Sequence, residues 1–261
     1  MPKRRSLTTL LFCSLLLVGA VAHAKEQIRV GLYHFPPFVV NEGDQVGGLA
    51  TELLVLMNAH QDKYEFVPVA TSPSTRHEIL NLGRCDISMF EQAEWGWKNY
   101  DVDITEPFLD GSEVYIALAQ PNRDQSYFDS FEDKTMIGVK GYHYRFANYN
   151  SDRNYLEKHF NMQLTPSNLG SIQMVLQGQR GDIAVVTRSF LGQFLKDHPE
   201  QKERLLISEK LDQTYHLSAV LRKGITLDIA TLNELIDSLI EDGSLAPLLQ
   251  DIRFDTGVGA L

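Results

Sequence analysis

The stretch ILNLGRCDISMF, residues 79–90, decides the fold, because its pattern recurs later in the chain as VLQGQRGDIAVV, residues 175–186. Each copy is typical of a helix end, a tight turn and a buried strand. Asp86 aligns with Asp182, and an arginine stands two residues before each. Strands that alternate with helices in this way predict an α/β fold.

A second pair of similar stretches stands upstream of the first pair. VGLYHF, residues 30–35, resembles IGVKGYHY, residues 137–144, when two inserted residues are allowed. Any two strand–helix units look somewhat alike, but these pairs occur in the same order, so we expect two similar lobes. The expected elements of the first lobe are strands at 28–32, 64–69 and 86–90, with helices at 48–60 and 74–82, the latter capped by Ser74 and stopped by Gly83.

The chain is expected to cross between the lobes twice and so to form a hinge. Residues 115–125 read as a strand that runs into a polar stretch, and residues 214–225 contain a second apolar strand. Two helices follow, in 231–243 and 244–252, and are expected to return to the first lobe. The predicted division is 25–118 with 217–261 as lobe 1, and 119–216 as lobe 2.

The N-terminal segment, residues 1–24, has the pattern of a secretory signal peptide. It begins with three basic residues, continues through an apolar stretch and ends in Ala-His-Ala, which predicts cleavage after Ala24. Loss of Lys3, Arg4 and Arg5 changes the net charge from −10 to −13. Such a surface repels nucleic acid and anionic lipid. No other stretch is long and apolar enough to span a bilayer, so the signal pattern predicts a soluble exported protein without stable membrane insertion.

Cysteine usage argues against disulfides and metal sites. Cys13 lies in the expected signal, which leaves Cys85 as the single thiol of the mature chain. Its position before a strand favours a small buried residue over a reactive thiol. The histidines and acidic residues show no ligand-like clustering, and no cofactor is expected.

The carboxyl ends of strands are where open α/β sheets bind ligands. The stretches expected there are 33–38, 90–98, 141–145 and 187–188, together with the first turn of the helix at 74–82. They carry aromatic rings and mixed charges, which suit a small zwitterion or a polar ring compound; the alternative is that the rings pack under their own loops. Their rings are Phe35, Phe90, Trp95, Trp97, Tyr142 and Tyr144, their cations Arg76, Lys98 and Arg188, and their other ionisable groups Glu91, Glu94, His34 and His143.

Motifs of catalysis are absent from the sequence. It contains no G-x-S-x-G elbow, phosphate loop, G-x-G-x-x-G or H-E-x-x-H. Glu91 and Glu94 are spaced as an acid/base pair, yet such spacing is common on exposed turns. We therefore assign no catalytic residue.

The order of several short motifs resembles the periplasmic solute-binding proteins of polar amino-acid ABC transporters, over nearly all of the mature chain. The motifs are the aromatic-P-P-F loop at 30–38, G-x-x-x-E-L at 48–53, L-x-x-G-x-x-D at 80–86, T-E-P-F at 105–108, a glycine pair within 137–141, L-x-x-x-x-x-D-I-A-V-V at 176–186 and E-D-G-S-L at 241–245. The resemblance implies two α/β lobes on a two-strand hinge, the type 2 periplasmic-binding-protein clamshell, with the last helices on the first lobe.

The residues that match the family's binding positions are partly altered. The resemblance implies that Phe35 flanks the ligand, that Lys98 replaces the arginine for an α-carboxylate, and that Thr187 replaces the aspartate for an α-amino group. Phe90 and Glu91 fall on positions that are small, hydroxylated residues in many members of the family, and Tyr142 and His143 replace a small Ser or Thr. Pro73 and Arg76 match the P-x-x-R with which the helix at 74–82 begins in one branch of the family. The positions that bind the carboxylate and the amino group of a zwitterion in the family are thus both changed. The residues expected to bind the ligand are His34, Phe35, Arg76, Phe90, Glu91, Lys98, Tyr142, His143, Tyr144, Thr187 and Arg188.

The resulting hypothesis is a monomeric periplasmic protein that captures a small polar solute for an inner-membrane ABC permease or a sensor. Two alternatives stay open. The first is a periplasmic enzyme similar to cyclohexadienyl dehydratase, with Glu91, Lys98 and His143 as acid/base groups. The second is an accessory or signalling module that binds a protein.

Overall fold

The computed structural model describes residues 24–42, 45–178 and 180–250. The expected signal peptide lies outside these residues, except for Ala24. Nine strands of the described chain form one mixed sheet, in the order β4-β1-β5-β11-β7-β10-β8-β9, with β6 paired to β11. Its strands are β1 Glu26–Tyr33, β4 Tyr64–Thr71, β5 Ile87–Glu91, β6 Val102–Ile104, β7 Leu109–Leu118, β8 Met136–Val139, β9 Gln163–Thr165, β10 Ile183–Thr187 and β11 Leu205–Arg222; β2 Val40–Glu42 and β3 Gln45–Gly47 form a separate hairpin.

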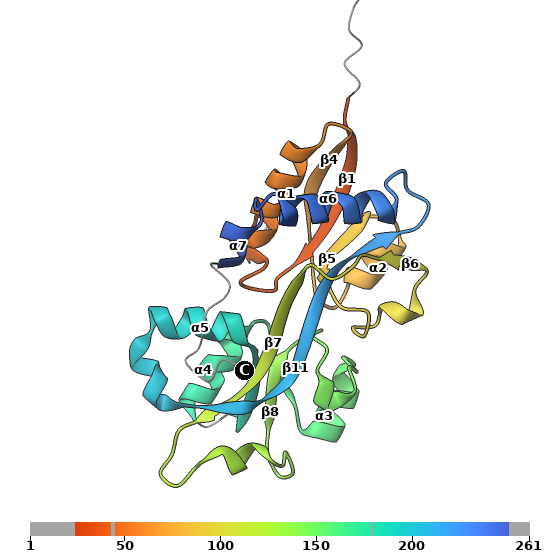
Figure 1. Ribbon diagram of the computed structural model, residues 1–261. Coiled ribbons are helices and arrows are strands. Elements are labelled where there is room, and N and C mark those ends of the chain that lie inside the picture. Colours follow the sequence, from red (N-terminus) through yellow and green to blue (C-terminus); the bar gives the residue numbers. More distant parts are fainter. Residues whose placement is uncertain (1–23, 43–44, 179, 251–261) are drawn as a thin grey trace, which may run out of the picture.

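The sheet repeats one strand pattern in each half of the molecule (Figure 1). In the first half β1 pairs in parallel with β4 and β5, and β5 pairs antiparallel with β11. In the second half β8 pairs in parallel with β9 and β10, and β10 pairs antiparallel with β7. The expected two similar α/β lobes are thus present in the topology.

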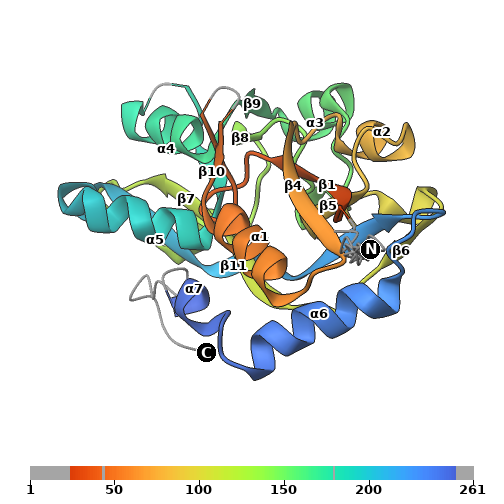
Figure 2. The same ribbon diagram turned by 90° about the horizontal axis from the view of Figure 1, so that it is seen from above.

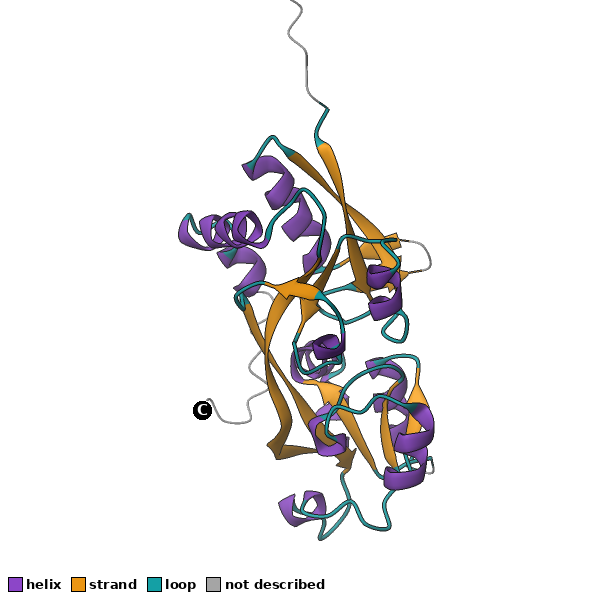
Figure 3. Ribbon diagram, turned by 90° about the vertical axis from the view of Figure 1, so that its right-hand side faces the viewer, coloured by secondary structure: helices purple, strands orange, loops and turns teal. Residues whose placement is uncertain are grey.

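Two long antiparallel strands, β7 and β11, join the halves (Figures 1 and 3). They pair from Leu205↔Leu118 to Leu217↔Leu109, with shifts of register around Leu211. Both strands begin earlier than the sequence pattern predicts, because their pairing with each other continues through the polar residues between the halves.

Helices cover both faces of the sheet, with α2, α3 and α4 on one side of the molecule and α6 and α7 on the other (Figure 2). The C-terminal helices α6 and α7 pack against α1, in the first half, as expected. Among the described residues, every helix is too short or too polar to cross a membrane. The helices are α1 Leu49–His60, α2 Arg76–Asn81, α3 Arg153–Phe160, α4 Asn168–Gln177, α5 Arg188–Asp197, α6 Ile229–Glu241 and α7 Ala246–Gln250.

The start of α2 differs from the prediction. The helix begins at Arg76 rather than Ser74, and its N-cap, Thr75, makes no side-chain cap bond. A preceding turn explains the difference, because the backbone N–H groups of Thr75 and Arg76 both donate to the carbonyl of Ser72. The expected stop at Gly83 is confirmed by its positive φ of 66°.

The repeated aspartates fix the neighbouring parallel strands in both halves. Oδ2 of Asp86 accepts from the backbone N–H of Arg29 at 3.0 Å, and Oδ2 of Asp182 accepts from that of Thr135 at 2.8 Å. The backbone N–H of each aspartate returns a bond to the carbonyl of the same partner. The sequence repeat is therefore a repeat of backbone hydrogen bonding, because each aspartate satisfies one backbone donor of the neighbouring strand segment, Arg29 within β1 or Thr135 directly before β8.

Asp86 also forms ion pairs with two arginines, whereas Asp182 forms none with any residue that the structure describes. Arg29 and Arg222 approach its Oδ1 at 2.8 and 2.9 Å, so one carboxylate ties β1, β5 and β11 together. Cys85 beside it is 1% exposed, as expected, and burial raises its pKa to about 11.

Replacement of Asp86 by asparagine is expected to destabilise the protein, because two arginines lose their counter-charge. Asp86 is buried but both arginines are partly exposed, so we expect a loss of about 2 kcal/mol, less than for a fully buried ion pair. Urea unfolding of Asp86→Asn measures this loss. The control Asp62→Asn removes a fully exposed aspartate that lies 3.5 Å from Lys25, and it should leave the stability almost unchanged because solvent screens this pair. Equal stabilities for the two variants would contradict the role of Asp86.

Candidate functional site

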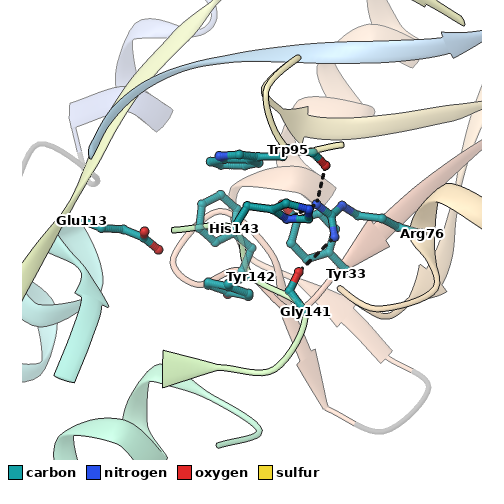
Figure 4. A pocket seen from close by; sticks show the side chains of 8 residues that line it. Tyr33, Arg76, Trp95, Glu113, Gly141, Tyr142 and His143 are labelled. Atoms are coloured by element: carbon teal, nitrogen blue, oxygen red, sulfur yellow. Dashed lines mark hydrogen bonds between the residues drawn. The ribbon is translucent and has the colours of Figure 1, made fainter. Parts of the chain in front are cut away.

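A small cavity lies where the two halves meet (Figure 4). Its volume is about 10 Å³, which is room for one water-sized group. The first half contributes the end of β1, the start of α2 and the segment after β5, while the second contributes the loop after β8. The hinge strand β7 contributes one residue. The lining residues are Tyr33, Phe35, Arg76, Trp95, Glu113, Gly141, Tyr142 and His143.

The aromatic loop after β1 reaches the cavity because two prolines end the sheet. Pro36 and Pro37 have no N–H to continue a ladder. The backbones of Phe35 and Val39 instead exchange two hydrogen bonds across them, at 2.9 and 3.0 Å. This turn holds Phe35 against Tyr33, with ring centroids 5.7 Å apart.

Arg76 is a buried cation at the boundary, and its first partner is Glu91. Nε of Arg76 lies 2.8 and 3.1 Å from the two carboxylate oxygens of Glu91, and the hydroxyl of Ser88 donates to the same carboxylate. The guanidinium also lies over the ring of Tyr33, 4.9 Å from its centroid. Complete burial raises the pKa of Glu91, while the adjacent guanidinium favours its ionised form.

The other four N–H groups of Arg76 also have acceptors, two of them in the second half (Figure 4). They donate to the carbonyls of Pro73, Gly141 (3.3 Å) and Trp95 (3.5 Å) and to Nδ1 of His143 (3.2 Å). A guanidinium has five N–H donors, so none is left for a ligand carboxylate in this arrangement. The chain uses Arg76 to hold its own halves together.

The loop after β8 touches the first half directly. Gly141 has φ +84°, and a Cβ there would lie 2.8 Å from backbone atoms of Pro73 and Ser74. The hydroxyl of Tyr142 donates to the carbonyl of His34 at 2.9 Å. Glycine is therefore required both for the conformation and for the close approach.

Gln213, on β11, links the cavity walls to one another. Its Nε2 donates to Oε2 of Glu113 and to the carbonyl of His143, both at 2.6 Å, and its Oε1 accepts from the indole of Trp95 at 3.2 Å. Glu113 is 2% exposed. Its burial and the nearby Asp212 raise its pKa well above the ordinary value.

The structure brings together only part of the expected ligand-binding set. Phe35, Arg76, Tyr142 and His143 line the cavity; Glu91 lies behind it through its bond to Arg76. His34 contributes its carbonyl to the contact with Tyr142.

The remaining expected residues lie elsewhere. Phe90 packs against Phe38 and Phe108, and Lys98 is exposed and pairs with Glu94 at 3.0 Å. The hydroxyl of Tyr144 accepts from the backbone N–H of Val139, and that of Thr187 accepts from the side-chain amide of Asn168. Arg188 is the first residue of α5. Lys98 points away because the short helix Trp97–Asn99 buries Trp97 instead.

The expected ligand-binding set left out four lining residues, Tyr33, Trp95, Glu113 and Gly141, and also Gln213, which bonds to Glu113 and Trp95. Trp95 was expected near the site as a ring but was not assigned to it. A signal for Glu113 exists in the sequence, since a glutamate directly before the apolar run 114–119 is unusual inside a buried strand. No group of three or more His, Cys, Asp or Glu in the described ranges is placed to hold a metal ion.

Comparisons with known proteins show the fold. No protein-family model and no curated protein sequence matches the chain. A substrate binding protein of an amino acid ABC transporter is 16% identical, with a TM-score of 0.66 over 88% of this chain and 100% of its own. An ancestral arginine-binding protein bound to glutamine is 14% identical, with a TM-score of 0.66 over 89% and 100%.

A third similar structure is the ancestral amino acid-binding protein AncCDT-1, a precursor of cyclohexadienyl dehydratase. It is 15% identical, with a TM-score of 0.65 over 88% of this chain and 96% of its own. These likenesses establish the two-lobed fold of periplasmic binding proteins, as the sequence pattern predicted.

The contact between Arg76 and His143 should make stability depend on pH. Burial, together with Arg76 and His77, lowers the pKa of His143 to about 2. Because the unfolded chain takes up a proton near pH 6.5 and the folded chain does not, stability falls as pH drops below that value, by at most about 1.4 kcal/mol per pH unit.

The variant His143→Asn keeps an acceptor for Arg76 but does not titrate. Urea unfolding of both proteins at pH 7.5, 6.5, 5.5 and 4.5 measures the difference. We expect the wild type to lose stability faster than the variant below pH 6.5. Parallel curves would contradict a buried neutral His143.

Proposed function

We propose that this protein is a periplasmic solute-binding protein that closes its two lobes on a small polar solute. The observation that carries the proposal is the position of the cavity: both halves and a hinge strand line it. Two continuous strands join the halves at this point, which permits a hinge motion. In the proposed division, 25–118 and 217–261 form one lobe and 119–216 the other.

The solute enters, in this proposal, when the halves separate. The present cavity admits one water-sized group, and the loop at Gly141 lies directly against Pro73 and Ser74. A larger solute requires that this contact open. Closed and open states would then differ in the contacts of Arg76, and a solute shifts their populations by its differential affinity.

The proposed setting is the periplasm, after cleavage of the signal behind Ala24. The proposed partner is an inner-membrane ABC permease or a sensor, and the protein acts as a monomer. Support comes from the N-terminal sequence pattern and from the fold, which it shares with a substrate binding protein of an amino acid ABC transporter.

An enzyme of the cyclohexadienyl dehydratase type is less well supported. The likeness to a precursor of that enzyme favours it, but that precursor is described as an amino acid-binding protein. Two of the three acid/base candidates, Glu91 and His143, are bonded to the guanidinium of Arg76, and the third, Lys98, is exposed beside Glu94 outside the cavity. Catalysis needs such groups within reach of one substrate.

A thermal-shift screen of residues 25–261 against amino acids, amines, organic acids and polar ring compounds tests the proposal. A true ligand at one hundred times its Kd adds about 2.7 kcal/mol to the free energy of unfolding. No stabilisation by any compound would contradict a solute-binding role.

Two variants then locate the site of any compound that binds. Trp95→Ala removes a wall of the cavity and should weaken binding about tenfold or more. Lys98→Ala alters the residue that the family resemblance places at the carboxylate, yet it should leave Kd unchanged because Lys98 lies outside the cavity. Isothermal titration with both variants measures this. Loss of binding in Lys98→Ala alone would move the site away from the cavity.

A further inference from the structure

We infer that the cavity recognises its solute through an organic ammonium group, which lies between aromatic rings with Glu113 as its counter-ion, and not through a carboxylate. This inference rests on the proposed solute-binding function and names its ligand class. It follows from the charges that remain available in the cavity and from the arrangement of the rings around them.

The positive charge at the cavity is already matched. Arg76 gives all five of its N–H groups to protein acceptors, and Glu91 lies against its Nε at 2.8 Å. His143 accepts from Arg76 through Nδ1 and is neutral, since its pKa is lowered by burial. With the halves in contact, an entering carboxylate would therefore meet no unused cation among the described lining residues. When the halves separate and Arg76 loses Gly141 and His143, its charge stays paired with Glu91, which lies in the same half.

Glu113 is the opposite case. Among the described residues, its carboxyl group accepts one hydrogen bond, from Gln213 to Oε2, and no Lys, Arg or His lies within ion-pair distance. Its neighbour Asp212 is satisfied instead by the hydroxyl of Tyr115 and two backbone N–H groups. A buried carboxyl without a cation is costly in its ionised form, so a cationic ligand is the partner that this position lacks.

Three rings form the walls of a box at the same place. The ring of Phe35 is perpendicular to that of Trp95, at 81° and 5.9 Å between centroids, and to that of Tyr142, at 89° and 5.6 Å. Figure 4 shows Trp95 and Tyr142 on opposite sides of a space into which Glu113 points. Ring faces attract cations, and several around one carboxylate select an ammonium group over a neutral one.

The phenol of Tyr142 and the indole of Trp95 do not compete for that space. The hydroxyl of Tyr142 donates to the carbonyl of His34, and the indole N–H of Trp95 donates to Gln213. Their polar atoms are thus engaged in the walls, which leaves the ring faces and the carboxyl to define the chemistry. A cavity of about 10 Å³ fits the head of a small ammonium group, and bulkier heads require the halves to separate further.

Matched compounds separate charge from shape. Methylammonium, butylammonium and choline are the cationic probes. Butanol and 3,3-dimethyl-1-butanol are neutral counterparts of the last two, and 3,3-dimethylbutanoate is an anionic one. Isothermal titration on residues 25–261 should give at least one cation that binds about tenfold or more tightly than its neutral counterpart, with no binding of the anion.

Two charge variants test the assignment to Glu113. Glu113→Gln should abolish the preference for cations, and its melting temperature should equal or exceed that of the wild type, because a buried carboxyl without a cation is removed. Glu94→Gln removes an exposed carboxylate outside the cavity and should leave the preference unchanged.

The outcomes distinguish this inference from the proposed function. If an anion or a neutral compound from the wider screen binds in the cleft and no cation does, or if Glu113→Gln keeps the preference, the ammonium site is overturned while solute binding stands. If no compound of any charge binds, both proposals fail.

Discussion

The arrangement of the two halves depends on the buried guanidinium of Arg76. A cation that is buried away from water is tolerated only when a counter-charge and hydrogen-bond acceptors surround it. Glu91 supplies the counter-charge, and the remaining acceptors come from both halves of the chain. Gly141 and His143 must therefore stay against the start of α2, which fixes how closely the second half approaches the first.

The repeated topology explains why the cavity forms at this boundary. In each half, an aspartate before a central strand accepts the backbone N–H of the adjacent parallel strand. This bond sets the relative positions of β1 and β5, and those of β8 and β10. The aromatic loops that follow β1 and β8 then leave the sheet at the carboxyl ends of these strands, one in each half, and meet each other. Because β7 and β11 run through both halves, Glu113 and Gln213 lie at the same meeting point.

The fold was largely predictable from the sequence, and the site only in part. The alignment of Asp86 with Asp182 predicted two similar α/β units. The alignment is informative because in each half the backbone N–H of the neighbouring strand segment needs a carboxylate acceptor at this position. Phe35, Tyr142 and His143 were predictable from the rule on strand ends. Lys98 was misleading as a guide to the cavity, since position in a motif does not fix which side chain a short helix buries. Gln213 gave no signal, because its role depends on three partners distant in sequence.

The contact between the halves is most directly tested by a distance across the cleft. Spin labels at two exposed positions, Leu82 at the end of α2 and Lys158 on α3, report it by pulsed electron resonance without any ligand, and the buried thiol of Cys85 stays unlabelled. Gly141→Ala adds a Cβ that collides with Pro73 and Ser74, whereas Gly224→Ala, with a similar φ of +79°, meets nothing within 4 Å. The account predicts one narrow distance for the wild type and Gly224→Ala, and a longer one for Gly141→Ala. The same broad distribution in all three would contradict a fixed contact between the halves.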